Sequence, residues 1–114
     1  MWKQRASFQV INWKALTKRI PHRVQVSRKS FYEICYVDTF VDKDVLGETR
    51  FDVKQIALKD DQPHKEKVHT YLHELLHAIS DEYEVNLTET QVRALEKAIY
   101  YVLKSDNVFK KAKK

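Results

Sequence analysis

The sequence predicts a small α+β domain in which a three-stranded, mostly antiparallel sheet precedes two helices. Apolar and polar residues alternate in the first half of the chain, which is typical of half-buried strands. In the second half, apolar residues recur every three or four positions, which is typical of amphipathic helices. The 114 residues include one glycine and two prolines, so we expect regular elements joined by few tight turns.

Length and composition predict one domain that spans residues 1–114. Hydrophobic residues make up 43% of the chain, a share that excludes an intrinsically disordered protein. No apolar run approaches the length of a membrane span, and the first residues lack the apolar stretch of a signal peptide. We therefore expect a cytoplasmic protein without membrane contact, and the sequence indicates no oligomeric state.

The first half of the chain is expected to form a short helix and three strands. The helix should stop at Pro21, because proline cannot continue a helical hydrogen-bond pattern. The strands are rich in β-branched and aromatic residues, and serines connect the first two strands as a hairpin. The expected elements are a helix at 13–20, strands near 23–27 and at 31–40, a third strand at 47–58 that the pattern allows to bend, and a polar loop at 60–63.

The first long helix is predicted from about Lys65 to about Tyr83. At 100° per residue its apolar side chains form one stripe, and three histidines, His69, His73 and His77, fall just beside it. These histidines should therefore lie at the rim of the core, where a cleft is expected. The apolar stripe consists of Val68, Leu72, Leu75, Leu76, Ile79 and Tyr83.

The second long helix should begin after Thr88, which is a good N-cap residue with Gln91 at the capping-box position. The link between the two helices is short, so we expect them to pack as antiparallel neighbours. The helix should fade near residues 105–107, and residues 105–114 should form a frayed basic tail. Its apolar stripe consists of Val92, Leu95, Ile99, Val102 and Leu103.

The run His73-Glu74-Leu75-Leu76-His77 is the main functional signal of the chain. Two histidines four residues apart share one helix face and can bind one zinc ion, and the glutamate beside them can act as a general base. The plain alternative is a pair of exposed histidines with an ordinary helical glutamate. The position of the run in mid-helix, beside an apolar stripe, favours a zinc site with Glu74 as the catalytic residue.

A catalytic zinc ion usually has three protein ligands, and this helix supplies two. His69 and His77 are eight residues apart, about 12 Å along the axis, so His69 cannot join His73 and His77 on one ion. The third ligand must come from another segment. The candidates are Glu89 and Glu96 on the next helix, with Asp81 and Glu82 as weaker alternatives that require the first helix to end early.

Geometry alone does not choose between the two glutamates of the second helix. Simple antiparallel alignment brings Glu96 nearer to the level of the two histidines, whereas a splayed helix pair favours Glu89. Both residues skirt the apolar stripe of their helix, so either side chain is able to face the histidines.

From Leu46 onward the order of features resembles a known family. Leu46-Gly47-Glu48 precedes a strand, Thr70–Ile79 carries the two histidines after a polar loop, and Leu87–Val92 opens a helix. These features resemble the small zincin-like metallopeptidases of bacteriophages and prophages, which are distantly similar to the ImmA/IrrE group. The resemblance covers roughly the last two thirds of the chain.

The resemblance implies a minimal zincin-like fold and a zinc ion. In the family, an acidic residue at the start of the following helix completes the zinc site, which implies Glu89 as the third ligand and leaves Glu96 as the fallback. The larger relatives have a glycine between the two histidines, where this chain has Leu76. They also carry further domains that bind a repressor or DNA, so the resemblance does not name the substrate.

The expected function is zinc-dependent hydrolysis of peptide bonds in a protein or peptide substrate. An oxyanion-stabilising donor would be Tyr71, Tyr83, Tyr100 or His69, and the sequence singles out none of them. The alternative is a catalytically silent phage or prophage protein of the same fold that binds a host protein or nucleic acid. The net charge of +5 and the basic ends of the chain support that alternative weakly. Either protein would act in the cytoplasm of a bacterial host.

Overall fold

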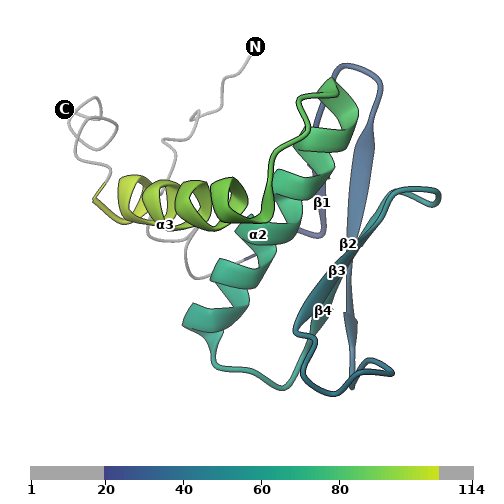
Figure 1. Ribbon diagram of the computed structural model, residues 1–114. Coiled ribbons are helices and arrows are strands. Elements are labelled where there is room, and N and C mark those ends of the chain that lie inside the picture. The colour runs from purple at the N-terminus through teal and green to yellow at the C-terminus, as the bar shows by residue number, and fades with distance from the viewer. Residues whose placement is uncertain (1–19, 106–114) are drawn as a thin grey trace, which may run out of the picture.

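The computed structural model describes residues 20–105, and all statements below concern this part of the chain. Its fold is α+β, as predicted. The elements, labelled as in Figure 1, are β1 (Arg23–Gln25), β2 (Phe31–Val37), β3 (Gly47–Arg50), β4 (Gln55–Lys59), α2 (His64–Tyr83) and α3 (Glu89–Ser105).

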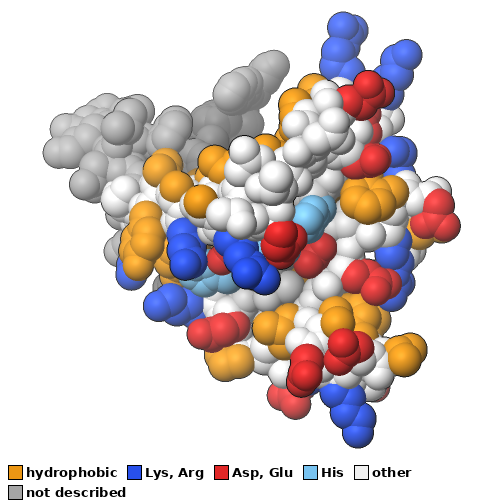
Figure 2. Space-filling model, in the orientation of Figure 1, with side chains coloured by type: hydrophobic (Ala, Val, Ile, Leu, Met, Phe, Trp, Pro, Cys, Tyr) orange, Lys and Arg blue, Asp and Glu red, His pale blue; other side chains and the backbone are white. Residues whose placement is uncertain are grey.

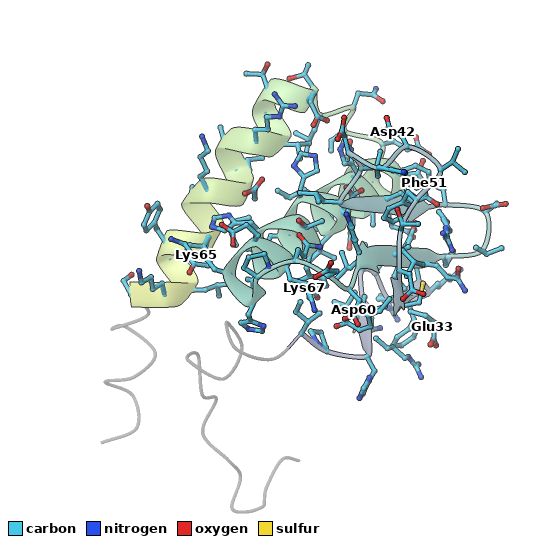
Figure 3. All side chains as sticks on the ribbon, turned by 90° about the horizontal axis from the view of Figure 1, so that it is seen from below. Glu33, Asp42, Phe51, Asp60, Lys65 and Lys67 are labelled. Carbon is cyan, nitrogen blue, oxygen red and sulfur yellow. The ribbon has the colours of Figure 1, made fainter. Side chains whose placement is uncertain are left out.

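The elements form three layers. The sheet is the first layer, α2 packs on one face of it, and α3 lies on the far side of α2 from the sheet (Figures 1 and 3). Because α2 is the middle layer, it is covered on two sides. Val68, Leu72 and Leu76 of the expected apolar stripe are buried, whereas Tyr83 at its end is 55% exposed. Tyr71, Glu74 and Ala78, which lie outside that stripe, are buried as well.

The sheet differs in detail from the predicted three-stranded, mostly antiparallel one: two of its three strand pairings are antiparallel, but the strand number is wrong. The sheet has four strands in the order β1-β2-β4-β3, and its central pair is parallel. Ile34 of β2 is opposite Ile56 of β4 in that pair, whereas β1 and β3 run antiparallel to their neighbours at the two edges. Parallel pairing needs a crossover connection, and here the antiparallel edge strand β3 lies within that connection.

The predicted third strand at 47–58 is in fact the hairpin of β3 and β4. Residues 51–54 form the turn, and Lys54 adopts a left-handed backbone with φ of 54°. The apolar residues Phe51 and Val53 continue the alternation of a strand, yet their side chains are 43% and 56% exposed. The turn contains no glycine, proline or asparagine, so the sequence gives only a weak turn signal.

Both long helices occur where they were predicted, but their packing differs from the prediction. α3 crosses α2 steeply instead of lying along it (Figure 1). The reason lies in the link, where Glu84 and Asn86 both adopt left-handed backbone with φ of 55°. The buried Ser80 fixes this link, because its hydroxyl oxygen accepts a 2.8 Å hydrogen bond from the Leu87 amide. The predicted capping box forms, since Gln91 N–H donates to Thr88 Oγ1 at 3.1 Å.

The core joins the sheet to both helices. Tyr32, Ile56, Leu58 and Val92 have the largest fully buried side chains, and together they come from two strands and α3. Ile20 also lies in the core, outside any helix. The rest of the predicted helix at 13–20, and residues 106–114 of the predicted basic tail, lie outside the described residues.

Candidate metal centre and cleft

α2 presents the predicted motif toward two different neighbours. Glu74 faces β3, whereas His73 and His77 face α3. Residues four apart on a helix share one face, so the two histidines point the same way, and the adjacent Glu74 points elsewhere. His73 and His77 lie edge to face, with ring centroids 5.0 Å apart. The middle layer of the fold therefore supplies both the candidate ligands and the candidate base.

Glu89, the first residue of α3, meets the two histidines. Its carboxylate oxygens lie 2.9 Å from His73 Nε2 and 3.2 Å from His77 Nε2. One ligand atom from each of these three residues lies within 4.8 Å of the others. The three residues, called the His-His-Glu group below, are able to hold a metal ion.

The spacing of the donor atoms fits a small divalent cation. In a tetrahedral zinc site with bonds of about 2.0–2.1 Å, ligand atoms lie about 3.3 Å apart. The distances from the Glu89 oxygens to the two Nε2 atoms are close to this spacing. Three protein donors also leave one coordination position open, as in catalytic metal sites.

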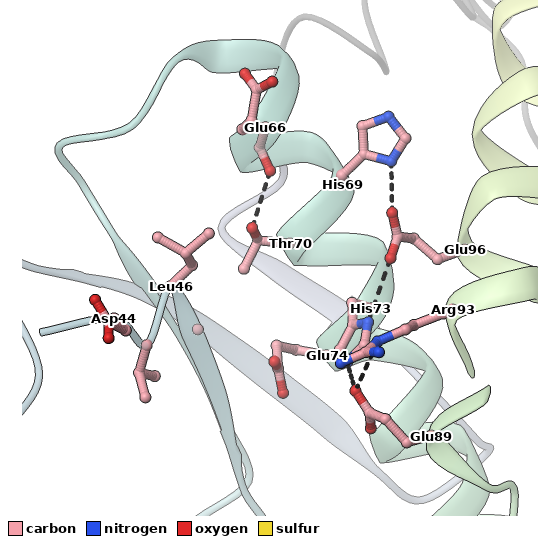
Figure 4. Close-up of a pocket in the computed structure, with 12 residues that line it drawn as sticks. Asp44, Leu46, Glu66, His69, Thr70, His73, Glu74, Glu89, Arg93 and Glu96 are labelled. Carbon is pink, nitrogen blue, oxygen red and sulfur yellow. Dashed lines mark hydrogen bonds and ion pairs between the residues drawn. The ribbon is translucent and has the colours of Figure 1, made fainter. Parts of the chain in front are cut away.

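Glu96, the fallback ligand, approaches His73 from the other side of the ring. Its carboxylate oxygens lie 3.3 Å from His73 Nδ1 and 2.6 Å from His69 Nδ1, so it is not a member of the His-His-Glu group (Figure 4). His69 therefore lies beside the group without joining it, as helix geometry required.

The two weaker alternatives are not brought to the site. Glu82 accepts a 2.8 Å hydrogen bond from Ser27 in the β1–β2 hairpin, and the hydrogen bonds from Ser27 and Ser30 lower the pKa of its carboxyl group. Asp81 is exposed in the last turn of α2. α2 does not end early, so neither residue meets the two histidines.

Glu74 is buried, with 8% of its surface exposed. Burial raises the pKa of its carboxyl group, and Glu89 raises it slightly further, whereas a hydrogen bond from Thr49 and the nearby His73 and His77 oppose the shift. Thr49 Oγ1 lies 2.8 Å from Glu74 Oε1 and 2.9 Å from the Glu74 carbonyl oxygen, so its hydroxyl orients the side chain. The sequence pattern did not indicate Thr49, because a half-buried threonine in a strand is common.

Gly47 lets β3 approach α2 closely beside the candidate base. A Cβ atom at this position would lie 2.5 Å from Thr70 Cγ2, 3.2 Å from Glu74 Cγ and 3.3 Å from the Ala57 carbonyl oxygen. The only glycine in the chain thus occupies the contact between the sheet edge and the motif.

Replacing Gly47 with alanine should therefore destabilise the protein by about 1–3 kcal/mol, the usual cost of an extra methyl group in a packed site. Urea denaturation measures the free energy of unfolding. The matched control is Glu48→Ala, whose side chain belongs to the neighbouring position of the same strand and points to the other face of the sheet. Equal stabilities of the two variants would contradict the close approach.

A cleft of about 530 Å³ opens in front of His73, Glu74 and Glu89. Its walls come from α2, from the first two turns of α3 and from the segment leading into β3 (Figure 4). On the surface, histidine and acidic side chains appear together in the middle of this face (Figure 2). The lining residues are Asp44, Val45, Leu46, Gly47, Glu66, His69, Thr70, His73, Glu74, Glu89, Arg93 and Glu96.

Arg93 is the one cation of the cleft wall among the described residues, and the sequence did not single it out. Its Nε lies 3.5 Å from a Glu89 oxygen, one helical turn away on α3, and its side chain is 68% exposed. Glutamate and arginine four residues apart are a common pair on helices, so the spacing of Glu89 and Arg93 gave no functional signal. Arg93 comes near the histidines only because α3 crosses α2.

Of the four candidate oxyanion donors, only His69 lines the cleft. Burial raises the pKa of Tyr71 to about 12, with a smaller contribution from Tyr36. Tyr83 donates a 2.8 Å hydrogen bond to the Val26 carbonyl oxygen in the β1–β2 hairpin. Tyr100 stacks on His69, with ring centroids 4.1 Å apart.

No protein family model matches the chain, and no curated protein or solved structure is significantly similar to it. Neither of the two helices in the described part is long and apolar enough to cross a membrane. The basic C-terminal end of the chain lies outside the described residues, and nothing in the described part tests a nucleic-acid partner, so that alternative stays a prediction.

Proposed function

We propose that this chain is a zinc-dependent metallopeptidase. The observation that carries the proposal is that a buried carboxyl group, Glu74, lines one open cleft together with His73 and Glu89 of the His-His-Glu group. A purely structural metal site has no need of a base beside an open coordination position. The proposal also uses the sequence resemblance to zincin-like peptidases described above.

Zinc is the metal that the donor set favours. Two imidazoles and one carboxylate are a common set for catalytic zinc, whereas calcium and magnesium prefer oxygen ligands alone. A zinc ion held by His73, His77 and Glu89 would polarise the scissile carbonyl group and lower the pKa of the attacking water. The chain's own residues then supply the proton transfers and the substrate contacts.

Glu74 is the proposed general base and acid. Its carboxylate would accept the proton of the attacking water and later donate it to the leaving amine. A base works best when its pKa approaches the pH of the reaction, and in the metal-free protein burial raises the pKa of Glu74 in that direction. The hydrogen bond from Thr49 holds one carboxylate oxygen, which leaves the other oxygen for the proton transfer.

The substrate backbone is proposed to bind along β3. The sheet order makes β3 an edge strand, so one row of its backbone groups has no partner strand. An extended peptide can pair with such an edge, and the residues at the start of β3 line the cleft. This arrangement would place a peptide bond between the sheet edge and the His-His-Glu group.

The test is cleavage of a peptide library by the purified, zinc-loaded chain, with products identified by mass spectrometry. We expect new N-termini that disappear when the protein is treated with a chelator and return when zinc is restored. Protein stripped of metal and reloaded with magnesium serves as the control. Stoichiometric zinc binding without any chelator-sensitive cleavage would refute the proposed peptidase activity and leave only a metal-binding protein.

A further inference from the structure

The two ring nitrogens of His73 face two different carboxylates. Nε2 lies 2.9 Å from Glu89, and Nδ1 lies 3.3 Å from Glu96. A neutral imidazole has one N–H donor and one nitrogen lone pair. If Nε2 gives its lone pair to a metal, Nδ1 must carry the hydrogen, and Glu96 is the acceptor placed to receive it.

The Glu96 carboxylate also binds His69, one helical turn before His73. Its second oxygen lies 2.6 Å from His69 Nδ1, so one carboxylate spans the two rings (Figure 4). The Glu96 side chain is 14% exposed, whereas that of Glu89 is 48% exposed. A carboxylate that is largely shielded from water needs hydrogen-bond partners, and the two histidine nitrogens serve as such partners and hold Glu96 in one orientation.

His69 is itself fixed by the core. Its ring stacks on Tyr100 with 4.1 Å between centroids and 28° between planes, and Tyr100 is 8% exposed within the core cluster. Contacts therefore run from the core through Tyr100, His69 and Glu96 to His73. Among the described residues, no comparable carboxylate meets Nδ1 of His77, which contacts Glu89 through Nε2.

We propose that Glu96 is a positioning residue that holds the His73 ring with Nε2 toward the metal, and that His69 holds Glu96 in place for this role. The inference rests on the proposed zinc site. In this inference Glu96 binds Nδ1 of His73, the ring nitrogen that faces away from the metal. Glu96 therefore affects the metal only through the His73 ring. Such carboxylate–histidine contacts fix the ring orientation and make the nitrogen a stronger ligand.

The experiment measures zinc affinity by competition with a chromophoric chelator, together with the visible spectrum of the cobalt-substituted protein. Glu96→Ala should weaken zinc binding by about 10–100-fold, the usual effect of losing such an outer contact. Glu96→Gln keeps the shape and should show a smaller loss. The cobalt spectrum should keep its tetrahedral intensity in both variants, because His73, His77 and Glu89 remain.

His69→Phe tests the second half of the proposal, since phenylalanine can still stack on Tyr100 but has no nitrogen to bind Glu96. It should weaken zinc binding in the same direction, and the double variant with Glu96→Ala should bind no more weakly than Glu96→Ala alone. Glu66→Gln is the matched control. It removes another carboxylate from the cleft wall, on the first turn of α2, and should leave the affinity unchanged.

Three results would overturn the inference. A Glu96→Ala variant that binds zinc as tightly as the wild type would refute the positioning role while leaving the zinc site intact. Loss of tetrahedral cobalt intensity in Glu96→Ala, with its retention in Glu89→Ala, would make Glu96 the ligand. A wild-type chain that binds no zinc would refute the proposed function together with this inference, so the two failures are distinguishable.

Discussion

Replacing Glu74 with glutamine is expected to slow peptide cleavage by about 10²–10⁴-fold, the usual contribution of a general base, while zinc stays bound. Glutamine has nearly the same shape but cannot accept the proton of the attacking water. Its amide oxygen can still accept the hydrogen bond from Thr49, so the side chain should keep its place. Initial cleavage rates at saturating zinc, with metal content measured on the same samples, provide the test.

The same variant should not be less stable than the wild type. Burial raises the pKa of Glu74, so the folded state disfavours the charged form of this group. Its contribution to stability is therefore greatest at low pH and declines as the pH rises above 4.5, the usual pKa of a glutamate, toward the raised value. Neutral glutamine avoids that penalty at pH 7, which the free energy of unfolding of the metal-free proteins would measure.

A Glu74→Gln enzyme with unchanged cleavage would contradict the role of Glu74. The matched control is Glu66→Gln, which removes an exposed carboxylate from the same cleft and should cleave at the wild-type rate. If both variants lose activity equally, the negative charge of the cleft would matter instead of a specific proton transfer.

Local patterns predicted the helices well. The 3.6-residue periodicity and the proline before His64 gave the bounds of α2 to within one residue, and Thr88 with Gln91 marked the start of α3. These signals lie within a few residues of the structure they specify. For the same reason the motif of His73, Glu74 and His77 was expected on one helix before its surroundings were known.

The sheet was harder to predict because strand pairing is not local. The parallel contact of Ile34 with Ile56 joins residues far apart in the sequence, and no short pattern specifies it. The turn at 51–54 was missed because the exposed Phe51 and Val53 imitate the alternation of a strand. Burial of Glu74 was missed too, since it depends on β3 packing against α2.

The surroundings of the motif depend on the helix crossing. The left-handed residues Glu84 and Asn86 turn the chain between the two helices. As a result, Glu89 reaches the Nε2 atoms of His73 and His77. Glu96 reaches the Nδ1 atoms of His69 and His73. Sequence alone offered both glutamates as candidate third ligands, because both lie at the edge of the same apolar stripe. Only the crossing of α2 and α3 separates their positions around His73.

Single replacements of His73 or His77 with alanine are expected to remove stoichiometric zinc from the protein. Each variant loses one of three protein ligands, so affinity should fall by more than the roughly 100-fold upper limit for an outer contact. His73→Ala should be the more severe of the two, because it also leaves one oxygen of the partly buried Glu96 without its histidine partner. Elemental analysis after dialysis gives the zinc content per chain.

Thermal unfolding provides an independent measure of the same loss. Zinc that binds only the folded state at 100 times its dissociation constant stabilises that state by about 2.7 kcal/mol. In a domain of this size such a gain raises Tm by roughly 10–20 °C. The wild type and a His22→Ala control, altered at an exposed histidine outside the cleft, should show this shift. Both ligand variants should lose most of it, and a full zinc-dependent shift in either one would exclude that histidine as a ligand.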